Sequence, residues 1–157
     1  ANDLTLPDLA RLTDAFYLGG TKNGALMGEA LVLVNPALQE DFFRIKKQRG
    51  AVLAKGWLLG VQFEALLEDG LYFQLARHAN DMARKLQDGL KAKGYSFLFN
   101  QIFPIVPDAL LPALERICAF EVWGAAPEAG HTIIRLVASF ATEPSDVDGL
   151  LEAFPTP

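Results

Sequence analysis

The residue whose setting best suits chemistry in this chain is Lys22. It follows Gly19, Gly20 and Thr21 and precedes Gly24, so a single cation stands in backbone that bends tightly and leaves room for another group. A lysine at the mouth of a packed site is partly desolvated, so its amine loses its proton more easily and can attack a carbonyl. This is the chemistry of an imine-forming lysine, but a lysine in a glycine-rich turn is most often a solvated loop residue, and the residues alone favour that alternative.

A second candidate is Arg135, which stands in an otherwise apolar run at residues 132–138. An unpaired guanidinium in such a run is costly, so Arg135 is expected to face an anion. The planar fork of arginine suits a carboxylate, which it binds with two parallel hydrogen bonds. The alternatives are a salt bridge to a nearby glutamate and a strand position that faces solvent.

The elements on either side of Lys22 follow from hydrophobic periodicity. Apolar runs at residues 15–18 and 30–34 predict two short strands, and the absence of alternation in the second indicates a strand covered on both faces. Thr5 and Asp8 resemble a capping box at the start of a helix. Helices are predicted at residues 6–12, 37–50, 51–67 and 71–93. The third of these is apolar almost all round, which favours burial in a core or a subunit contact.

The remainder of the chain predicts a small α+β layer. Residues 96–105 read as a strand, Asp108 opens a helix, residues 120–124 and 132–140 read as two further strands, and Thr142 caps a last helix. We therefore expect the order strand, helix, strand, strand, helix after the long helix at residues 71–93.

Composition excludes several functional classes. With 51% hydrophobic and 21% charged residues among 157, the chain is globular. A net charge of -5 and a pI near 5.0 argue against nucleic acid as the main partner. No apolar run reaches the ~18 residues of a membrane span, and no export leader opens the chain. The lone Cys118 fits a reducing cytoplasm, and two histidines with one cysteine make a metal site improbable.

Several segments resemble the threonine aldolase and β-eliminating lyase family, whose members use pyridoxal phosphate. The resemblance is carried by residues 17–25 (YLGGTKNGA), 28–30 (GEA), 47–51 (KQRGA), 53–56 (LAKG), 62–66 (QFEAL) and 134–137 (IRLV). It implies an α/β fold of the aspartate-aminotransferase-like type. Residues 1–70 would be the end of the large cofactor-binding domain, and residues 71–157 a linking helix with the small C-terminal α+β domain. Because the lysine lies mid-chain in complete members, we expect a missing N-terminal segment.

The resemblance also implies roles for particular residues. Lys22 would hold pyridoxal phosphate as a Schiff base and move protons, and Arg135 would bind the α-carboxylate of an amino-acid substrate. Thr21 is a candidate for the cofactor phosphate, with a hydroxyl that ties down the turn as the alternative. Either Lys47 or Arg49 would also contact the phosphate, and a solvated helix face is the alternative for both.

The implied reaction is retro-aldol cleavage of a β-hydroxy-α-amino acid, such as threonine to glycine and acetaldehyde. The family places active sites at subunit contacts, which implies a homo-oligomer. The ring-stacking histidine and the aspartate that pairs with the pyridine nitrogen precede the lysine segment in the family, so the chain alone is expected to be inactive. The alternatives are β-elimination on the same scaffold and a non-catalytic assembly module that retains the fold.

Overall fold

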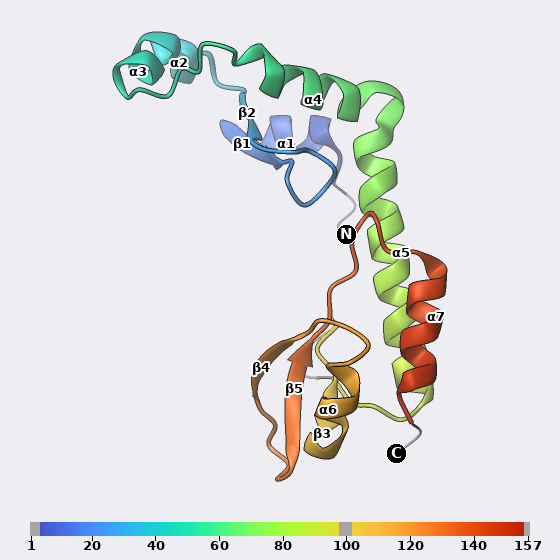
Figure 1. Ribbon diagram of the computed structural model, residues 1–157. Coiled ribbons are helices and arrows are strands. Elements are labelled where there is room, and N and C mark those ends of the chain that lie inside the picture. Colours follow the sequence, from blue (N-terminus) through green and yellow to red (C-terminus); the bar gives the residue numbers. More distant parts are fainter. Residues whose placement is uncertain (1–3, 98–101, 156–157) are drawn as a thin grey trace. The chain divides into compact units, whose positions relative to one another are not determined.

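The protein is described by a computed structural model covering residues 4–97 and 102–155 (Figure 1). The chain forms two compact units, residues 1–75 and residues 76–157. Among the described residues, no helix is both long enough and apolar enough to cross a membrane. Each unit is taken by itself below.

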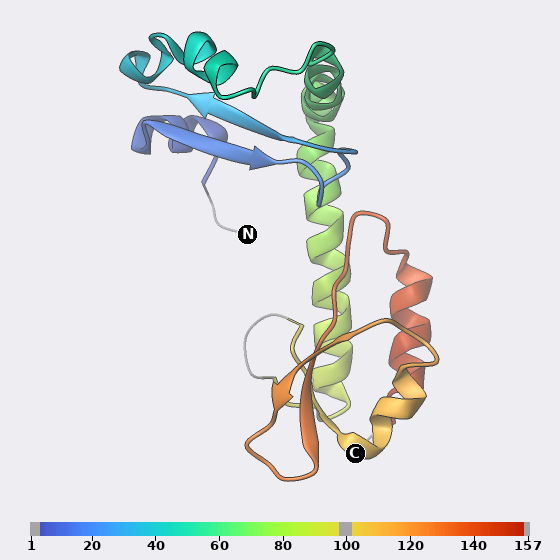
Figure 2. The same cartoon turned by 60° about the vertical axis from the view of Figure 1, so that its left-hand side comes forward.

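The first unit contains short helices around a two-stranded antiparallel sheet (Figures 1 and 2). Its elements are α1 (Leu6–Leu12), β1 (Ala15–Gly19), β2 (Glu29–Leu33), α2 (Pro36–Gln39), α3 (Phe42–Gln48), α4 (Trp57–Leu67) and η1 (Glu68–Gly70). The predicted capping box is confirmed, since the Thr5 amide donates to Asp8 Oδ2 at 3.0 Å and the Asp8 amide donates to Thr5 Oγ1 at 3.3 Å. These bonds satisfy two amides that the first turn of α1 leaves without helical partners.

The predicted strands form a hairpin, β1 pairing with β2 from Ala15 opposite Leu33 to Gly19 opposite Glu29. The expectation that the second strand is covered on both faces is wrong. Leu31 of β2 is exposed, and Tyr17 opposite it keeps 67% of its surface accessible. Because only two strands pair, one face of this sheet stays in solvent while Leu18 packs on the other.

Two helix predictions need correction. The single helix predicted at residues 37–50 is α2 and α3, separated at Asp41, whose φ of 56° is left-handed and cannot continue a helix. The helix predicted at residues 51–67 begins only at Trp57, after a turn in which the Gly56 amide donates to the Leu53 carbonyl. Only Phe63 and Leu66 of α4 are buried within this chain, so a core position is wrong for most of the helix, and the alternative of a subunit contact stays a prediction.

The second unit packs a three-stranded antiparallel sheet against helices, with the strand order β3-β5-β4. The helix α5 (Leu71–Ala92) runs into it and is followed by β3 (Ile105–Pro107), η2 (Asp108–Leu110), α6 (Leu111–Leu114), β4 (Glu121–Ala125), β5 (His131–Arg135) and α7 (Pro144–Ala153). The order of elements matches the prediction. The strand predicted at residues 96–105 includes residues 98–101, which lie outside the described residues.

Several predicted bounds in this unit are too long or displaced. The last predicted strand stops at Arg135 instead of continuing to residue 140. The cap of α7 is Glu143, which forms a capping box with Asp146, while the Thr142 hydroxyl accepts a hydrogen bond from the Ser139 amide instead. Asp108 does not cap a helix; its carboxylate accepts from the Thr132 hydroxyl at 2.7 Å. Thr142 thus satisfies a partner three residues away, whereas Asp108 bonds to a strand residue 24 positions along the chain.

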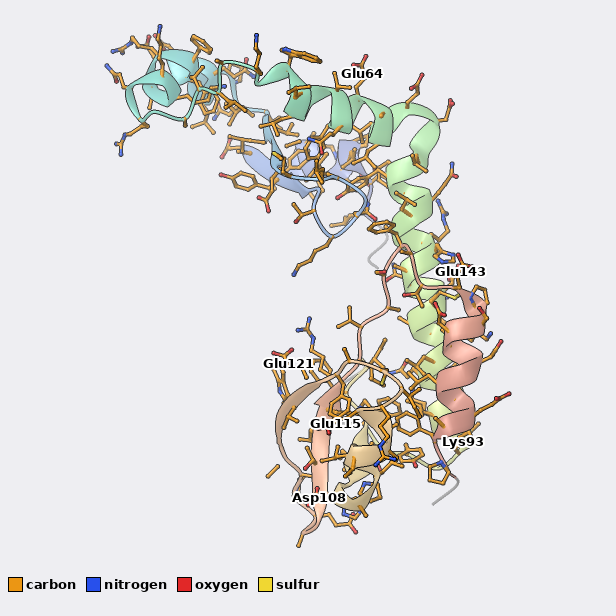
Figure 3. All side chains as sticks on the ribbon, viewed as in Figure 1. Glu64, Lys93, Asp108, Glu115, Glu121 and Glu143 are labelled. Atoms are coloured by element: carbon orange, nitrogen blue, oxygen red, sulfur yellow. The ribbon has the colours of Figure 1, made fainter. Side chains whose placement is uncertain are left out.

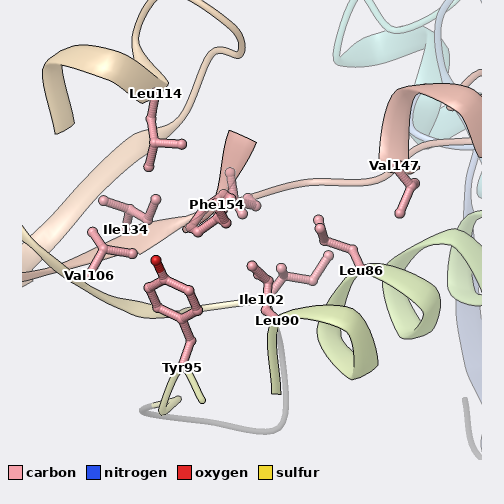
Figure 4. Packing of buried hydrophobic residues seen from close by; sticks show 10 residues of the cluster. Leu86, Leu90, Tyr95, Ile102, Val106, Leu114, Ile134, Val147 and Phe154 are labelled. Atoms are coloured by element: carbon pink, nitrogen blue, oxygen red, sulfur yellow. The ribbon is translucent and has the colours of Figure 1, made fainter. Parts of the chain in front are cut away.

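The core of the second unit gathers side chains from both ends of its sequence (Figure 4). Leu90 of α5, Val106 of β3, Ile134 of β5 and Phe154 after α7 are fully buried. The Tyr95 ring meets the Phe154 ring edge-on with centroids 5.1 Å apart, and the Tyr95 hydroxyl donates to the Pro155 carbonyl. The long helix predicted at residues 71–93 is therefore confirmed as α5, and its buried residues Leu86 and Leu90 belong to this core.

Replacing the buried ring of Phe154 tests this description. Phe154→Ala should lower the free energy of unfolding by about 3–5 kcal/mol, because it removes a fully buried aromatic side chain and leaves a cavity. The matched control is Phe43→Ala, since Phe43 is 63% exposed and its loss should change stability by less than about 0.5 kcal/mol. Urea unfolding followed by tryptophan fluorescence measures both variants, and equal losses would contradict the assignment of this core.

Candidate functional site

Lys22 lies in the turn that joins β1 to β2, and the backbone of this turn is closely folded. The amides of Asn23 and Ala25 both donate to the Gly20 carbonyl, at 2.9 and 3.0 Å. Gly24 has a φ of +97°, in the left-handed region that glycine adopts without strain. The Lys22 side chain itself is exposed.

Gly20 is the position where no side chain fits. A Cβ placed on it would lie 2.8 Å from both Ala25 Cβ and Phe63 Cζ, and 2.9 Å from the Gly28 carbonyl oxygen. At Gly19, by contrast, an added Cβ would meet no atom within 4 Å. The expected need for tightly bent backbone around Lys22 is thus confirmed at Gly20 and Gly24, whereas Gly19 is not required by space.

Side chains from two other elements hold this turn at points on either side of Lys22. Gln62 of α4 accepts hydrogen bonds through Oε1 from the amides of Leu26 and Met27, at 2.8 and 3.3 Å. Asn23 donates through Nδ2 to the Tyr72 carbonyl at 2.8 Å, and the Tyr72 hydroxyl donates to the Gly19 carbonyl at 2.8 Å. The turn is therefore ordered by its neighbours, and Lys22 Nζ is left free to meet another group.

Gln62 and Tyr72 are positioning residues that sequence reasoning did not identify. One signal was present for Gln62, because it is a polar residue in the largely apolar sequence of α4. An amide side chain on such a surface usually satisfies backbone groups that the packing has removed from water. Tyr72 carried no comparable signal, since its hydroxyl and its carbonyl act through contacts distant in sequence.

The expectation that Lys22 sits at the mouth of a packed site is not met by the described residues of this unit. Its side chain is exposed, as is that of Thr21. No residue in the described part of the chain forms a hydrogen bond with the Thr21 hydroxyl, so the alternative role of tying down the turn is unsupported. Both groups remain accessible on ordered backbone.

Lys47 and Arg49 are not brought to Lys22 within the first unit. Lys47 is exposed on α3 and Arg49 is the exposed residue that ends this helix. The helix follows the end of β2 that lies farthest from the Lys22 turn, as both ribbon views show (Figures 1 and 2). A phosphate role for either residue stays a prediction that this unit does not support.

Arg135 pairs with a glutamate, which was one alternative foreseen for it. It ends β5 directly opposite Glu121 of β4, and Arg135 Nη1 lies 2.9 Å from Glu121 Oε2. The two side chains are 40% and 60% exposed, so solvent reaches both of them. Arg135 belongs to the second unit and Lys22 to the first.

The second unit also contains a cavity of about 520 Å³ between α5, α7 and the segments that follow α6 and β5. It is lined mainly by apolar side chains such as Leu86, Leu136 and Val147, together with Cys118. Burial raises the pKa of the Cys118 thiol, which favours its neutral form. The lining includes none of the residues predicted for chemistry, and no described group of side chains could hold a metal ion.

Two curated proteins are similar in sequence to part of this chain. It is 42% identical over 73 residues to a low-specificity L-threonine aldolase of a Pseudomonas species (strain NCIMB 10558), a match over 46% of this chain and 21% of that protein. It is 34% identical over 106 residues to the low-specificity L-threonine aldolase of Pseudomonas aeruginosa, over 64% of this chain and 31% of that protein. No family model matches the chain.

A solved structure gives the same answer for the fold. The threonine aldolase of Leishmania major superposes with a TM-score of 0.89 and 42% sequence identity, over 96% of this chain and 45% of that one. The resemblance and the fold class inferred from the sequence are therefore confirmed. The chain spans less than half the length of each protein that it matches.

Adjacent glycines provide a matched test of the turn. Gly20→Ala should lower the free energy of unfolding by about 1–3 kcal/mol, because the added methyl overlaps Ala25 and Phe63. It should also speed hydrogen exchange at the amides of Asn23 and Ala25, which donate to the Gly20 carbonyl. Gly19→Ala, which meets open space, should leave stability and exchange at these amides unchanged. Calorimetry and amide exchange measure the difference, and a harmless Gly20→Ala would contradict the packing.

Proposed function

We propose that this chain belongs to a pyridoxal-phosphate-dependent lyase that cleaves β-hydroxy-α-amino acids, with threonine giving glycine and acetaldehyde. The observation that carries the proposal is the similarity to a threonine aldolase structure over 96% of this chain at 42% identity. The names of the two Pseudomonas relatives support the same reaction class.

The fit of the cofactor to this chain is partial. Lys22 offers an accessible amine on a turn fixed by four side-chain hydrogen bonds, which suits covalent attachment of an aldehyde. The free hydroxyl of Thr21 would donate to the phosphate. When bound, pyridoxal phosphate supplies an electron-withdrawing ring that stabilises the carbanion left by bond cleavage. We retain Lys47 or Arg49 as a candidate for the phosphate, although neither lies beside Lys22 within this unit.

The chain's own residues would divide the remaining tasks. Arg135 binds the substrate carboxylate with parallel hydrogen bonds, which orients the bond that must break. Lys22 Nζ carries a proton to and from the substrate once the amine is free. Gly20, Gln62 and Tyr72 hold the backbone that carries Lys22, so we assign them a positioning role.

We further propose that the complete site forms in a homo-oligomer in the cytoplasm and includes residues absent from this chain. Partial coverage of the relatives supports the need for further residues. Exposed apolar side chains on α4 support a subunit contact, among them Trp57, Leu58 and Val61. The same exposed face, together with the open position of Lys22, favours a second candidate, a non-catalytic assembly module. β-Elimination remains the alternative within the lyase class.

Attachment of the cofactor distinguishes the lyase from the module. The full-length polypeptide incubated with pyridoxal phosphate should gain the absorbance band of a lysine-bound cofactor, and borohydride reduction with peptide mapping should locate it on Lys22. Lys22→Ala should abolish the band. Lys55→Ala is the control, because Lys55 is another exposed lysine of the same unit. A cofactor mapped to a different lysine, or no band in the full-length protein, would favour the module.

Arg135→Ala tests carboxylate binding. Hydrogen bonds to charged groups contribute ~1.5–3 kcal/mol, so the KM for threonine should rise about 10- to 100-fold while kcat changes less. Arg84→Ala serves as control, since Arg84 forms an exposed ion pair with Asp81 in the same unit. Steady-state kinetics on the full-length enzyme measure both, and an unchanged KM in Arg135→Ala would remove Arg135 from the substrate site.

A further inference from the structure

We propose that Glu121 is a positioning residue for Arg135: it holds one nitrogen of the guanidinium and leaves the opposite edge open to the substrate carboxylate. The proposal rests on the proposed function, in which Arg135 binds that carboxylate. Glu121 lies on β4, at the edge of the three-stranded sheet (Figure 3). The argument depends on which guanidinium nitrogens the ion pair uses.

The pairing of the β4 and β5 backbones is enough to place the Glu121 and Arg135 side chains next to each other. Glu121 and Arg135 are directly opposite in the antiparallel ladder of β4 and β5, so their side chains project from the same face. The ladder shifts register between Val122 and Gly124, one pair beyond this one. Because β5 also pairs with β3, the strand that carries Arg135 is held on both sides.

The ion pair is monodentate. Within the described residues, Arg135 donates a hydrogen bond only from Nη1, to Glu121 Oε2 at 2.9 Å. Nε and Nη2, whose hydrogens point in the same direction, form the edge that binds a carboxylate with two parallel bonds. Arg44 in this same chain uses that edge, binding Asp41 through Nε at 3.0 Å and Nη2 at 2.7 Å. In Arg135 the corresponding edge is open.

The exposure of the pair indicates that its purpose is not the stability of the sheet. With 40% of Arg135 and 60% of Glu121 accessible, solvent screening leaves the ion pair little stabilising effect. It does restrict a long side chain that would otherwise sample many rotamers, and the ordering is complete before a carboxylate arrives. Glu121 therefore acts through the orientation of Arg135.

Glu121 has two opposing effects on carboxylate binding. Its hydrogen bond orders Arg135, which favours binding, whereas its negative charge repels the incoming carboxylate. A glutamine at this position separates the two effects, because its Oε1 still accepts the Nη1 hydrogen bond but carries no charge. Orientation by hydrogen bonding predicts that the glutamine variant behaves as the wild type does. Repulsion predicts that both glutamine and alanine improve binding.

The experiment is steady-state kinetics with threonine on the full-length enzyme. Glu121→Ala should raise KM about 3- to 10-fold with kcat within about 2-fold, because the freed Arg135 must be ordered on binding. Glu121→Gln should stay within about 2-fold of wild type in both constants. Glu115→Ala is the control, since Glu115 is an exposed glutamate of the same unit (Figure 3). Thermal unfolding of all variants should be alike, which separates positioning from a role in folding.

The outcomes separate this proposal from the function on which it rests. A lower KM in both Glu121 variants, or no change in either, overturns the positioning role. If Arg135→Ala raises KM while Glu121→Ala does not, only the role of Glu121 fails. If Arg135→Ala also leaves KM unchanged in an active enzyme, the carboxylate role of Arg135 fails as well.

Discussion

The first unit depends on the close approach of the Lys22 turn to α4, which the missing side chain of Gly20 permits. Phe63 fills the space that a Cβ at Gly20 would need, and Leu66 and Leu75 crowd Gly24 in the same way. On the same turn, the amides of Leu26 and Met27 donate hydrogen bonds to Gln62 Oε1 of α4. Packing at Gly20 and hydrogen bonding to Gln62 therefore hold the turn against the same helix.

The second unit depends on the burial of its three-stranded sheet by few residues. Phe154, beyond the end of α7, reaches the core formed by α5 and the sheet. Its carbonyl accepts a hydrogen bond from Lys93 at 2.7 Å, and the next carbonyl accepts one from Tyr95. The end of α5 and the segment after α7 are therefore tied by both apolar and polar contacts, which holds β5 and Arg135 in place.

Sequence reasoning predicted elements well where local chemistry decides them. The Thr5 and Asp8 capping box and the long helix α5 both follow from interactions within a few residues. It failed at Asp41, because an aspartate in the left-handed region looks the same in sequence as one within a helix. For α4 the apolar pattern showed which side chains could be buried, but it could not show whether this chain or a second subunit covers them.

In the candidate site, too, the features set by local sequence could be predicted, and those set by distant contacts could not. The positions of Lys22 and Thr21 on a turn between two strands could be predicted, because glycines mark the turn. The partner of Arg135 could not be chosen from the sequence, because it depends on the register that sets Glu121 opposite Arg135. That register includes a shift after Val122, which no local sequence pattern predicts. The contacts of Gln62 and Tyr72 are made 35 or more residues away in sequence, beyond the reach of any periodic pattern.

Lys22 and Arg135 nevertheless share one structural property that bears on catalysis. In both cases the backbone is fixed by neighbouring residues, through Gly19 and Asn23 for the turn and through the paired strands for β5. A charged group that made its own buried contacts would have to break them before it could bind a ligand. Here Lys22 is exposed and the Nε–Nη2 edge of Arg135 forms no hydrogen bond within the described residues, so a ligand that reaches either group has no internal partner to displace from it. This is the preorganisation that binding and catalysis favour, and it requires the folding energy to come from residues other than those that react.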